Sequence, residues 1–107
     1  MLFDSHAHLN DERFDEDREA LIQKLQEEHV DLVLNPGADI ETSISSVELA
    51  NKYDFIYAAA GIHPNDVENI NNSHIEAIEK LAMQQRVVAI GEIGLDYYRN
   101  YSDKDKQ

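Results

Sequence analysis

The sequence predicts an α/β fold with parallel strands, and three observations support this prediction. Four short apolar runs have the length of buried strands, namely residues Leu2–Asp4, Val30–Asn35, Phe55–Ala60 and Val87–Ile90. Between them lie three stretches in which apolar residues recur at helical spacing. Each run is followed by polar residues suited to chemistry. Alternating strands and helices favour a parallel sheet, and the sites of such sheets lie beyond the carboxyl ends of the strands.

The composition sets bounds on domain organisation and partners. The 107 residues are 42% hydrophobic, which suffices for one core, and no repeat or linker divides the chain, so we expect a single domain over residues 1–107. Nine Lys and Arg oppose 22 Asp and Glu, a formal charge of −13. Nonspecific nucleic-acid affinity comes largely from basic side chains. Tight binding of a polyanion would therefore need positive charge from bound cations.

Two further features concern the compartment. The chain has no cysteine, which excludes disulfides and thiolate metal sites. No basic region followed by a long apolar run opens the sequence, and no stretch approaches the roughly 18 apolar residues that would span a membrane. We therefore expect a cytoplasmic protein without a membrane partner.

The segment after the first strand carries the clearest candidate site. In an extended chain alternate side chains share a face, so Asp4, His6 and His8 are expected to point the same way. Imidazole together with carboxylate is a ligand mix that suits Zn, Mn, Fe or Ni. The alternative is that the two histidines only decorate an exposed strand.

The first predicted helix follows this segment. Asp15 is expected to cap it, and the helix should run to about Glu28. His29 closes it, where a solvated histidine interacting with the helix dipole is expected in place of a ligand.

The second and third helices are predicted to be scaffold. Asp39 begins the second, whose inward stripe should consist of Ile40, Ile44 and Val47. Ser73 and Glu76 read as a capping box that begins the third, with His74 exposed in the first turn. The inward stripe of the third helix is expected to be Ile75, Ile78, Leu81 and Ala82.

Two polar residues follow the second and third strands. Asn35 precedes Pro36 and either lines the mouth of the sheet or caps the turn, and capping is the favoured interpretation. His63 precedes Pro64, which restricts it toward an extended conformation and so partly fixes the imidazole. His63 is predicted to donate to a substrate phosphate or to support a metal ligand, and the alternative is a purely structural hydrogen bond.

The loop after the fourth strand supplies the remaining candidates. Glu92 follows an apolar strand, where a carboxylate is costly unless it is paired or coordinated, and the neighbouring glycines allow close backbone approach. Glu92 is predicted to reach the rim that carries His6 and His8. Arg99 matches the geometry of phosphate oxygens, and the alternative is an internal ion pair with Asp96.

Three motifs together resemble successive signatures of the TatD-family metal-dependent deoxyribonucleases. They are Asp-Ser-His-Ala-His-Leu at residues 4–9, Gly-Ile-His-Pro at residues 61–64 and Gly-Glu-Ile-Gly-Leu-Asp-Tyr-Tyr-Arg at residues 91–99. The resemblance implies a TIM-type (β/α) barrel, which needs about 250 residues. This chain would be its N-terminal portion, about four βα units. We expect two unpaired sheet edges and an unfilled inner face, which would favour self-association.

The resemblance also implies a function. The expected activity is divalent-metal-dependent hydrolysis of phosphodiester bonds, of the exonuclease type, with DNA as substrate. His6, His8 and Glu92 would hold one or two cations, among which Mg, Mn, Zn and Ni are not distinguished, and His63 and Arg99 would bind substrate. The family's catalytic Asp and two further His ligands come from later strands, so the 107 residues alone are expected to be inactive. The alternatives are a small-molecule amidohydrolase or lactonase, and an inactive fragment that self-associates.

Overall fold

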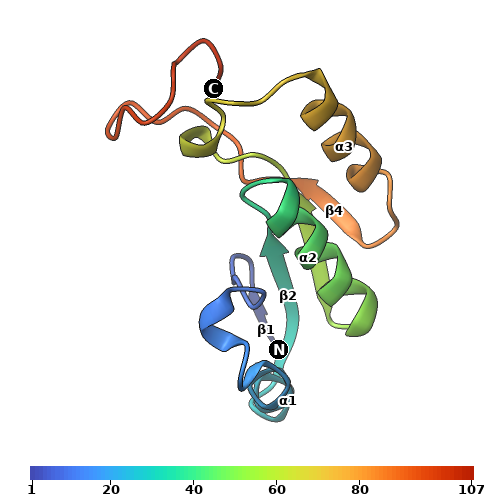
Figure 1. Cartoon of the computed structure of the whole chain (residues 1–107). Helices are drawn as coiled ribbons and strands as arrows, with labels where there is room; N and C mark the ends of the chain where they lie inside the picture. The colour runs from blue at the N-terminus through green and yellow to red at the C-terminus, as the bar shows by residue number, and fades with distance from the viewer.

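The computed structural model describes all 107 residues, and its centre is a parallel sheet with strand order β1-β2-β3-β4 (Figure 1). The strands are β1 (Leu2–Asp4), β2 (Val30–Pro36), β3 (Ile56–Ala60) and β4 (Val87–Ile90). All neighbouring pairs are parallel. The predicted parallel α/β sheet is confirmed, and the strand limits differ from the prediction by one residue in β2 and one in β3.

Each strand is joined to the next by a helix, as parallel neighbours require. The helices are α1 (Arg18–Glu27), α2 (Ile40–Lys52) and α3 (Asn72–Ala82), with short 3₁₀ turns η1 (Glu12–Phe14) and η2 (Pro64–Asp66). Because the strands run in one direction, their carboxyl ends meet at one end of the sheet, beside the C-terminal loop in Figure 1. None of the helices combines the length and the apolar character needed to cross a bilayer.

Helix α1 begins two residues later than expected, because its N-cap is Asp17 and not Asp15. Asp15 ends η1, and its carboxylate accepts a hydrogen bond from Arg18 Nη2 at 2.6 Å, so Asp17 takes the N-cap position. His29 follows the helix with a φ of 64° and is exposed, which agrees with the expected solvated histidine.

Helix α3 begins earlier than expected, because Asn71 caps it. The Asn71 side chain accepts from Ser73 N at 2.9 Å, and Asn71 N donates to His74 Nδ1 at 3.0 Å. The predicted capping box of Ser73 and Glu76 is therefore wrong, and His74 is half-buried where exposure was expected. The structural reason is that a side chain two residues upstream satisfies the free N–H groups first. Ile75 of the expected inward stripe is 53% exposed.

The buried face of α2 is half polar, and of the predicted stripe of Ile40, Ile44 and Val47 only Val47 is fully buried. Its buried residues are Ser43, Ser46, Val47 and Ala50, whereas Ile44 is 43% exposed. The helix lies close to the chain that follows β2, since a Cβ added at Gly37 would lie 2.1 Å from Ser43 Oγ. Such an approach admits small side chains and excludes large ones.

The two edge strands leave apolar side chains uncovered. Leu2 and Phe3 of β1 are each 60% exposed, and Val88 and Ile90 of β4 are 58% and 53% exposed. The expected open edges are therefore present, because β1 and β4 each pair with one strand only. Self-association through them stays a prediction.

Candidate metal centre

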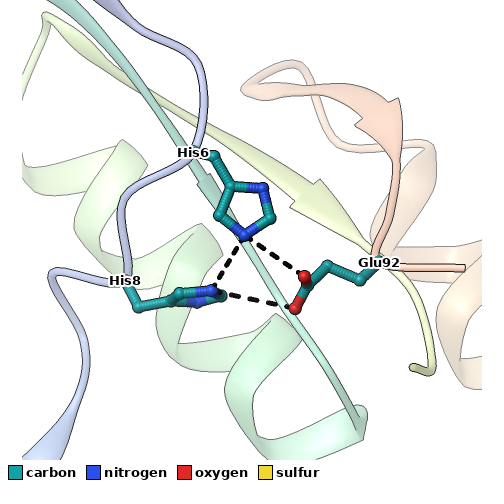
Figure 2. A group of neighbouring side chains, drawn as sticks. All are labelled: His6, His8 and Glu92. Atoms are coloured by element: carbon teal, nitrogen blue, oxygen red, sulfur yellow. Dashed lines mark hydrogen bonds and ion pairs between the residues drawn. The ribbon is translucent and has the colours of Figure 1, made fainter. Parts of the chain in front are cut away.

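Three side chains from the two ends of the sequence converge at the carboxyl end of the sheet (Figure 2). His6 Nε2 lies 3.1 Å from His8 Nε2 and 3.2 Å from Glu92 Oε1, and His8 Nε2 lies 3.7 Å from Glu92 Oε2. One donor atom from each residue falls within 4.8 Å of the others. The expected meeting of the two imidazoles with Glu92 is present in the structure.

Asp4 does not take part in this cluster, and the expectation that it would is wrong. Strand β1 ends at Asp4 and the chain bends at Ser5, so the alternation of an extended strand stops before the histidines. The Asp4 carboxylate turns back and accepts from His6 N at 3.0 Å. Its role in the structure is to fix the main chain at the first histidine.

Glu92 reaches the cluster because the main chains after β3 and β4 pass very close together. A Cβ added at Gly61 would lie 2.6 Å from the carbonyl carbon of Gly91, so only glycine fits there. Gly91 N donates to Ala60 O at 3.0 Å, and Glu92 N donates to Gly37 O at 2.6 Å. The peptide before Glu92 is thus tied to both neighbouring strand ends, and the Glu92 side chain remains 25% exposed.

The donor set fits a divalent cation. Tetrahedral Zn²⁺ with ligand bonds of about 2.0–2.1 Å needs donor atoms about 3.3 Å apart. The three observed separations of 3.1, 3.2 and 3.7 Å lie around this value. Two neutral imidazoles can face each other at 3.1 Å through a shared proton, and a cation satisfies both nitrogens and the carboxylate at once. That these residues bind metal stays a prediction.

The loop that carries the histidines is fixed by hydrogen bonds to its main chain. Arg18 donates to the carbonyl oxygens of the three residues that follow His8. The acceptors are Leu9 at 2.7 Å, Asn10 at 3.3 Å and Asp11 at 2.8 Å. From β2, Leu34 O accepts from Ala7 N at 3.1 Å. These bonds hold the main chain on both sides of His8.

The favoured interpretation of Asn35 as a cap of the turn is wrong. Asn35 lies within β2, is fully buried and accepts from Leu9 N at 2.6 Å, so it does not cap a turn. The missed signal was its place at the end of a buried strand, where an amide needs hydrogen-bond partners. Those partners come from the histidine loop.

His63 lies beside the cluster and has one ring nitrogen engaged. Its Nδ1 accepts from Asn65 N at 3.1 Å as the N-cap of η2, and its main-chain N–H donates to Ala38 O at 2.7 Å. In the neutral ring the proton therefore sits on Nε2. His63 lines a cavity of about 390 Å³ together with His6 and Glu92. Its contact with substrate stays a prediction.

Arg99 and Asp96 do not form the internal ion pair that was the alternative for Arg99, and the contact of Arg99 with a phosphate stays a prediction. The Asp96 carboxylate accepts from Arg99 N at 3.0 Å and from Tyr98 N at 2.8 Å, and these main-chain N–H groups, Arg99 first, hold the pKa of Asp96 below its usual value. The Arg99 guanidinium lies 5.8 Å from the Tyr98 ring centroid. The internal ion pair is therefore wrong, and Arg99 does not line the cavity beside Glu92.

A second hollow, of about 690 Å³, is lined by His8 and is acidic. The charged residues that line it are Asp11, Glu12, Arg13, Glu41 and Glu92. Arg13 donates from Nε and Nη2 to the Asp11 carboxylate, each at 3.0 Å, and lowers the pKa of Asp11 to about 2. Arg13 is thus already paired, so the surface around the cluster is negative.

Comparison with known sequences points to one family. The chain matches the family described as TatD related DNase over residues 3–107. It is 44% identical over 107 residues to the uncharacterized metal-dependent hydrolase YabD of Bacillus subtilis (strain 168), covering 100% of this chain and 42% of that protein. It is 34% identical over 106 residues to the 3'-5' ssDNA/RNA exonuclease TatD of Cronobacter turicensis, covering 99% of this chain and 40% of that protein. The chain thus spans about two fifths of these relatives.

Solved structures agree. A TatD homolog from Escherichia coli k12, YJJV, superposes with a TM-score of 0.81 at 31% identity, covering 92% of this chain and 39% of that one. A hydrolase TatD family protein from Entamoeba histolytica gives 0.82 at 24% identity, covering 98% and 41%, and supports the fold alone. The four-stranded sheet is thus the N-terminal portion of a TIM-type barrel. On the match over residues 3–107 and this shared fold, the chain belongs to the TatD-related DNase family.

Proposed function

We propose that this chain supplies the metal-binding part of a hydrolase that cleaves phosphodiester bonds in nucleic acid, in the manner of a DNA exonuclease. The observation that carries the proposal is the convergence of His6, His8 and Glu92 at the carboxyl end of the sheet. The names of the relatives, a metal-dependent hydrolase and a 3'-5' ssDNA/RNA exonuclease, support it.

Each residue of the cluster has a defined task in this proposal. His6 and His8 offer their Nε2 atoms, and Glu92 directs one carboxylate oxygen toward each imidazole. With its two carboxylate oxygens, Glu92 could hold one cation or two. When bound, the cations would polarise a phosphoryl oxygen and lower the pKa of water. Because the chain has a charge of −13, they also provide the positive charge that a polyanionic substrate needs.

His63 and Arg99 are proposed to bind the substrate. The engaged Nδ1 of His63 keeps the ring proton on Nε2, which lets that atom donate to a phosphate oxygen. Arg99 extends from the loop after β4 and would contact a more distant phosphate. We propose a cytoplasmic location for the protein.

The first test is metal binding by the 107-residue chain. We expect the double variant His6→Ala/His8→Ala to lose Zn²⁺ and Mn²⁺ binding in isothermal titration calorimetry, because two of the three donors are removed. The control is His29→Ala, an exposed histidine outside the cluster, which should bind as before. Unchanged binding by the double variant would contradict the proposal.

The second part of this test is hydrolysis. We expect no DNA cleavage by the 107 residues, and cleavage by a chimera in which they replace the matching part of the Bacillus subtilis relative. Activity on a labelled single-stranded oligonucleotide should require Mg²⁺ or Mn²⁺, stop with chelator and fail in the double variant. A panel of lactones and cyclic amides separates the amidohydrolase alternative, and sedimentation velocity separates the self-associating fragment.

A further inference from the structure

We propose that Asn35 is the positioning residue of this centre: it holds the loop that carries His6 and His8 in the arrangement that a cation requires. The inference rests on the proposed function insofar as a cation is bound. It goes beyond that function because Asn35 is not one of the three candidate metal ligands, His6, His8 and Glu92. Asn35 lies in β2, and its side chain forms hydrogen bonds to the loop.

Both N–H groups and the carbonyl oxygen of the Asn35 side-chain amide form hydrogen bonds. Its Oδ1 accepts from Leu9 N at 2.6 Å, and its Nδ2 donates to Asn10 Oδ1 at 2.9 Å and to Ser46 Oγ at 2.8 Å. The orientation of the amide follows from this network, since exchanging its oxygen and nitrogen would set an N–H group against Leu9 N–H. The side chain is 0% exposed, so water does not compete for these bonds.

Two of its three partners, Leu9 and Asn10, belong to the histidine loop and come directly after His8. Leu9 follows His8 directly, and Ala7, which precedes it, donates from N to Leu34 O at 3.1 Å. Consecutive residues of β2, Leu34 and Asn35, therefore bond to the loop residues on either side of His8. A shift of this main chain would move Nε2 of His8 away from Glu92.

The third partner links the network to α2. Ser46 Oγ donates to Thr42 O at 2.7 Å, and Asn10 Nδ2 donates to Ser45 Oγ at 2.7 Å. The amide is thus backed by a helix, which keeps it from following the loop. An apolar residue such as Val33 suits the same buried face of β2, so packing alone does not require an amide at position 35. It is the hydrogen bonds to the loop that require an amide at this position.

The test is Zn²⁺ titration of the 107-residue chain carrying Asn35→Leu, a change that keeps side-chain size and removes the amide. Loss of a residue that orients metal ligands typically weakens binding about tenfold to a hundredfold, and we expect a loss in that range. The control is Arg86→Ala. Arg86 donates to four main-chain carbonyl oxygens at the other end of the sheet, so its loss should lower the melting temperature and leave Zn²⁺ affinity unchanged.

Equal Zn²⁺ affinity in Asn35→Leu and the unchanged chain would overturn the proposal, and so would an equal loss of affinity in Arg86→Ala. If Asn35→Leu does not fold, Asn10→Ala takes its place. It removes from a half-buried position the amide that accepts from Asn35 Nδ2 and donates to Ser45 Oγ and Thr42 O, and it leaves the bond from Leu9 N to Asn35 in place. It should weaken Zn²⁺ binding less, and unchanged affinity would again overturn the proposal.

A measurement without metal separates this inference from the proposed function. The amide of Leu9 should exchange slowly with solvent in the unchanged chain and rapidly in Asn35→Leu, because its acceptor is gone. Unchanged exchange would refute the role of Asn35. Absent Zn²⁺ binding in the unchanged chain, with the exchange difference present, would refute the proposed function and leave the hold on the loop established.

Discussion

At each end of the sheet an arginine side chain donates hydrogen bonds to several main-chain carbonyl oxygens. The two ends differ in the residues that adjoin the bonded segment. At the carboxyl end, Arg18 bonds to the carbonyl oxygens of Leu9, Asn10 and Asp11. At the amino end, Arg86 bonds to those of Ala50, Tyr53, Asp54 and Ile56. Only the chain held by Arg18 continues from a pair of histidines.

The comparison teaches that an arginine on main-chain carbonyls is not in itself a sign of function. Such a guanidinium satisfies several acceptors that a bend leaves open, and this stabilises the fold at either end. The functional difference comes from strand direction, because the carboxyl ends of parallel strands bring separate loops to one place. Replacing Arg18 should therefore shift the candidate metal ligands, whereas replacing Arg86 should lower the stability of the fold alone.

The largest expected effect on stability is that of Arg86→Ala. The change removes four hydrogen bonds from a charged donor and the contact with Tyr57, whose ring centroid lies 4.3 Å from the guanidinium. We expect a loss of about 1.5–3 kcal/mol in the free energy of unfolding, the range for hydrogen bonds to charged groups. Urea denaturation measures it. A loss as small as that of a surface ion pair would show that the amino end is held by other contacts.

Arg18→Ala should have a smaller effect on stability and a measurable one on metal binding. The side chain is partly exposed and water replaces some of its bonds, so we expect a loss of about 1–2 kcal/mol in urea denaturation. Zn²⁺ affinity should fall because the loop after His8 is released. Asp15→Ala is the matched control, since it removes only the exposed ion pair to Arg18 and should change neither quantity appreciably. Unchanged affinity in Arg18→Ala would break the comparison.

The smallest effect concerns Asp11, beside the centre. Hydrogen bonds from the Arg13 side chain, and then from its main-chain N–H, lower the Asp11 pKa from 3.8 to about 2. Because the folded-state pKa is depressed, the stabilisation is complete above 3.8 and is lost as the pH falls through about 2. Arg13→Ala should move the pKa back toward 3.8, as carbon-detected NMR titration of the carboxyl group would show. A midpoint that stays near 2 would assign the shift to other contacts.

The sheet and the meeting of His6, His8 and Glu92 were predictable from the sequence. Apolar runs gave the strands, and the parallel order then placed the strand ends together. The fate of Asp4 was not predictable, since it depends on where the extended conformation stops, and the same holds for helix starts, where Asn71 and Ser73 compete for one role.

The polar residues that support the centre were not predictable from the sequence either. Periodicity assigns large apolar residues to the inside of a helix, whereas α2 turns Ser43 and Ser46 inward because it lies close to the sheet. That closeness depends on contacts between segments far apart in the chain. Asn35 is buried for the same reason, as its partners come from a loop and a helix 25 and 11 residues away.

Gly61 gives the centre an unusual vulnerability. The atom that would clash with the Gly91 carbonyl is a single methyl carbon, and it would come from a residue that donates nothing to the cluster. The smallest enlargement of that residue must push the peptide before Glu92 outward and so widen the gap that the carboxylate has to close. The spacing of the three candidate metal ligands thus depends partly on Gly61, a residue that has no side chain.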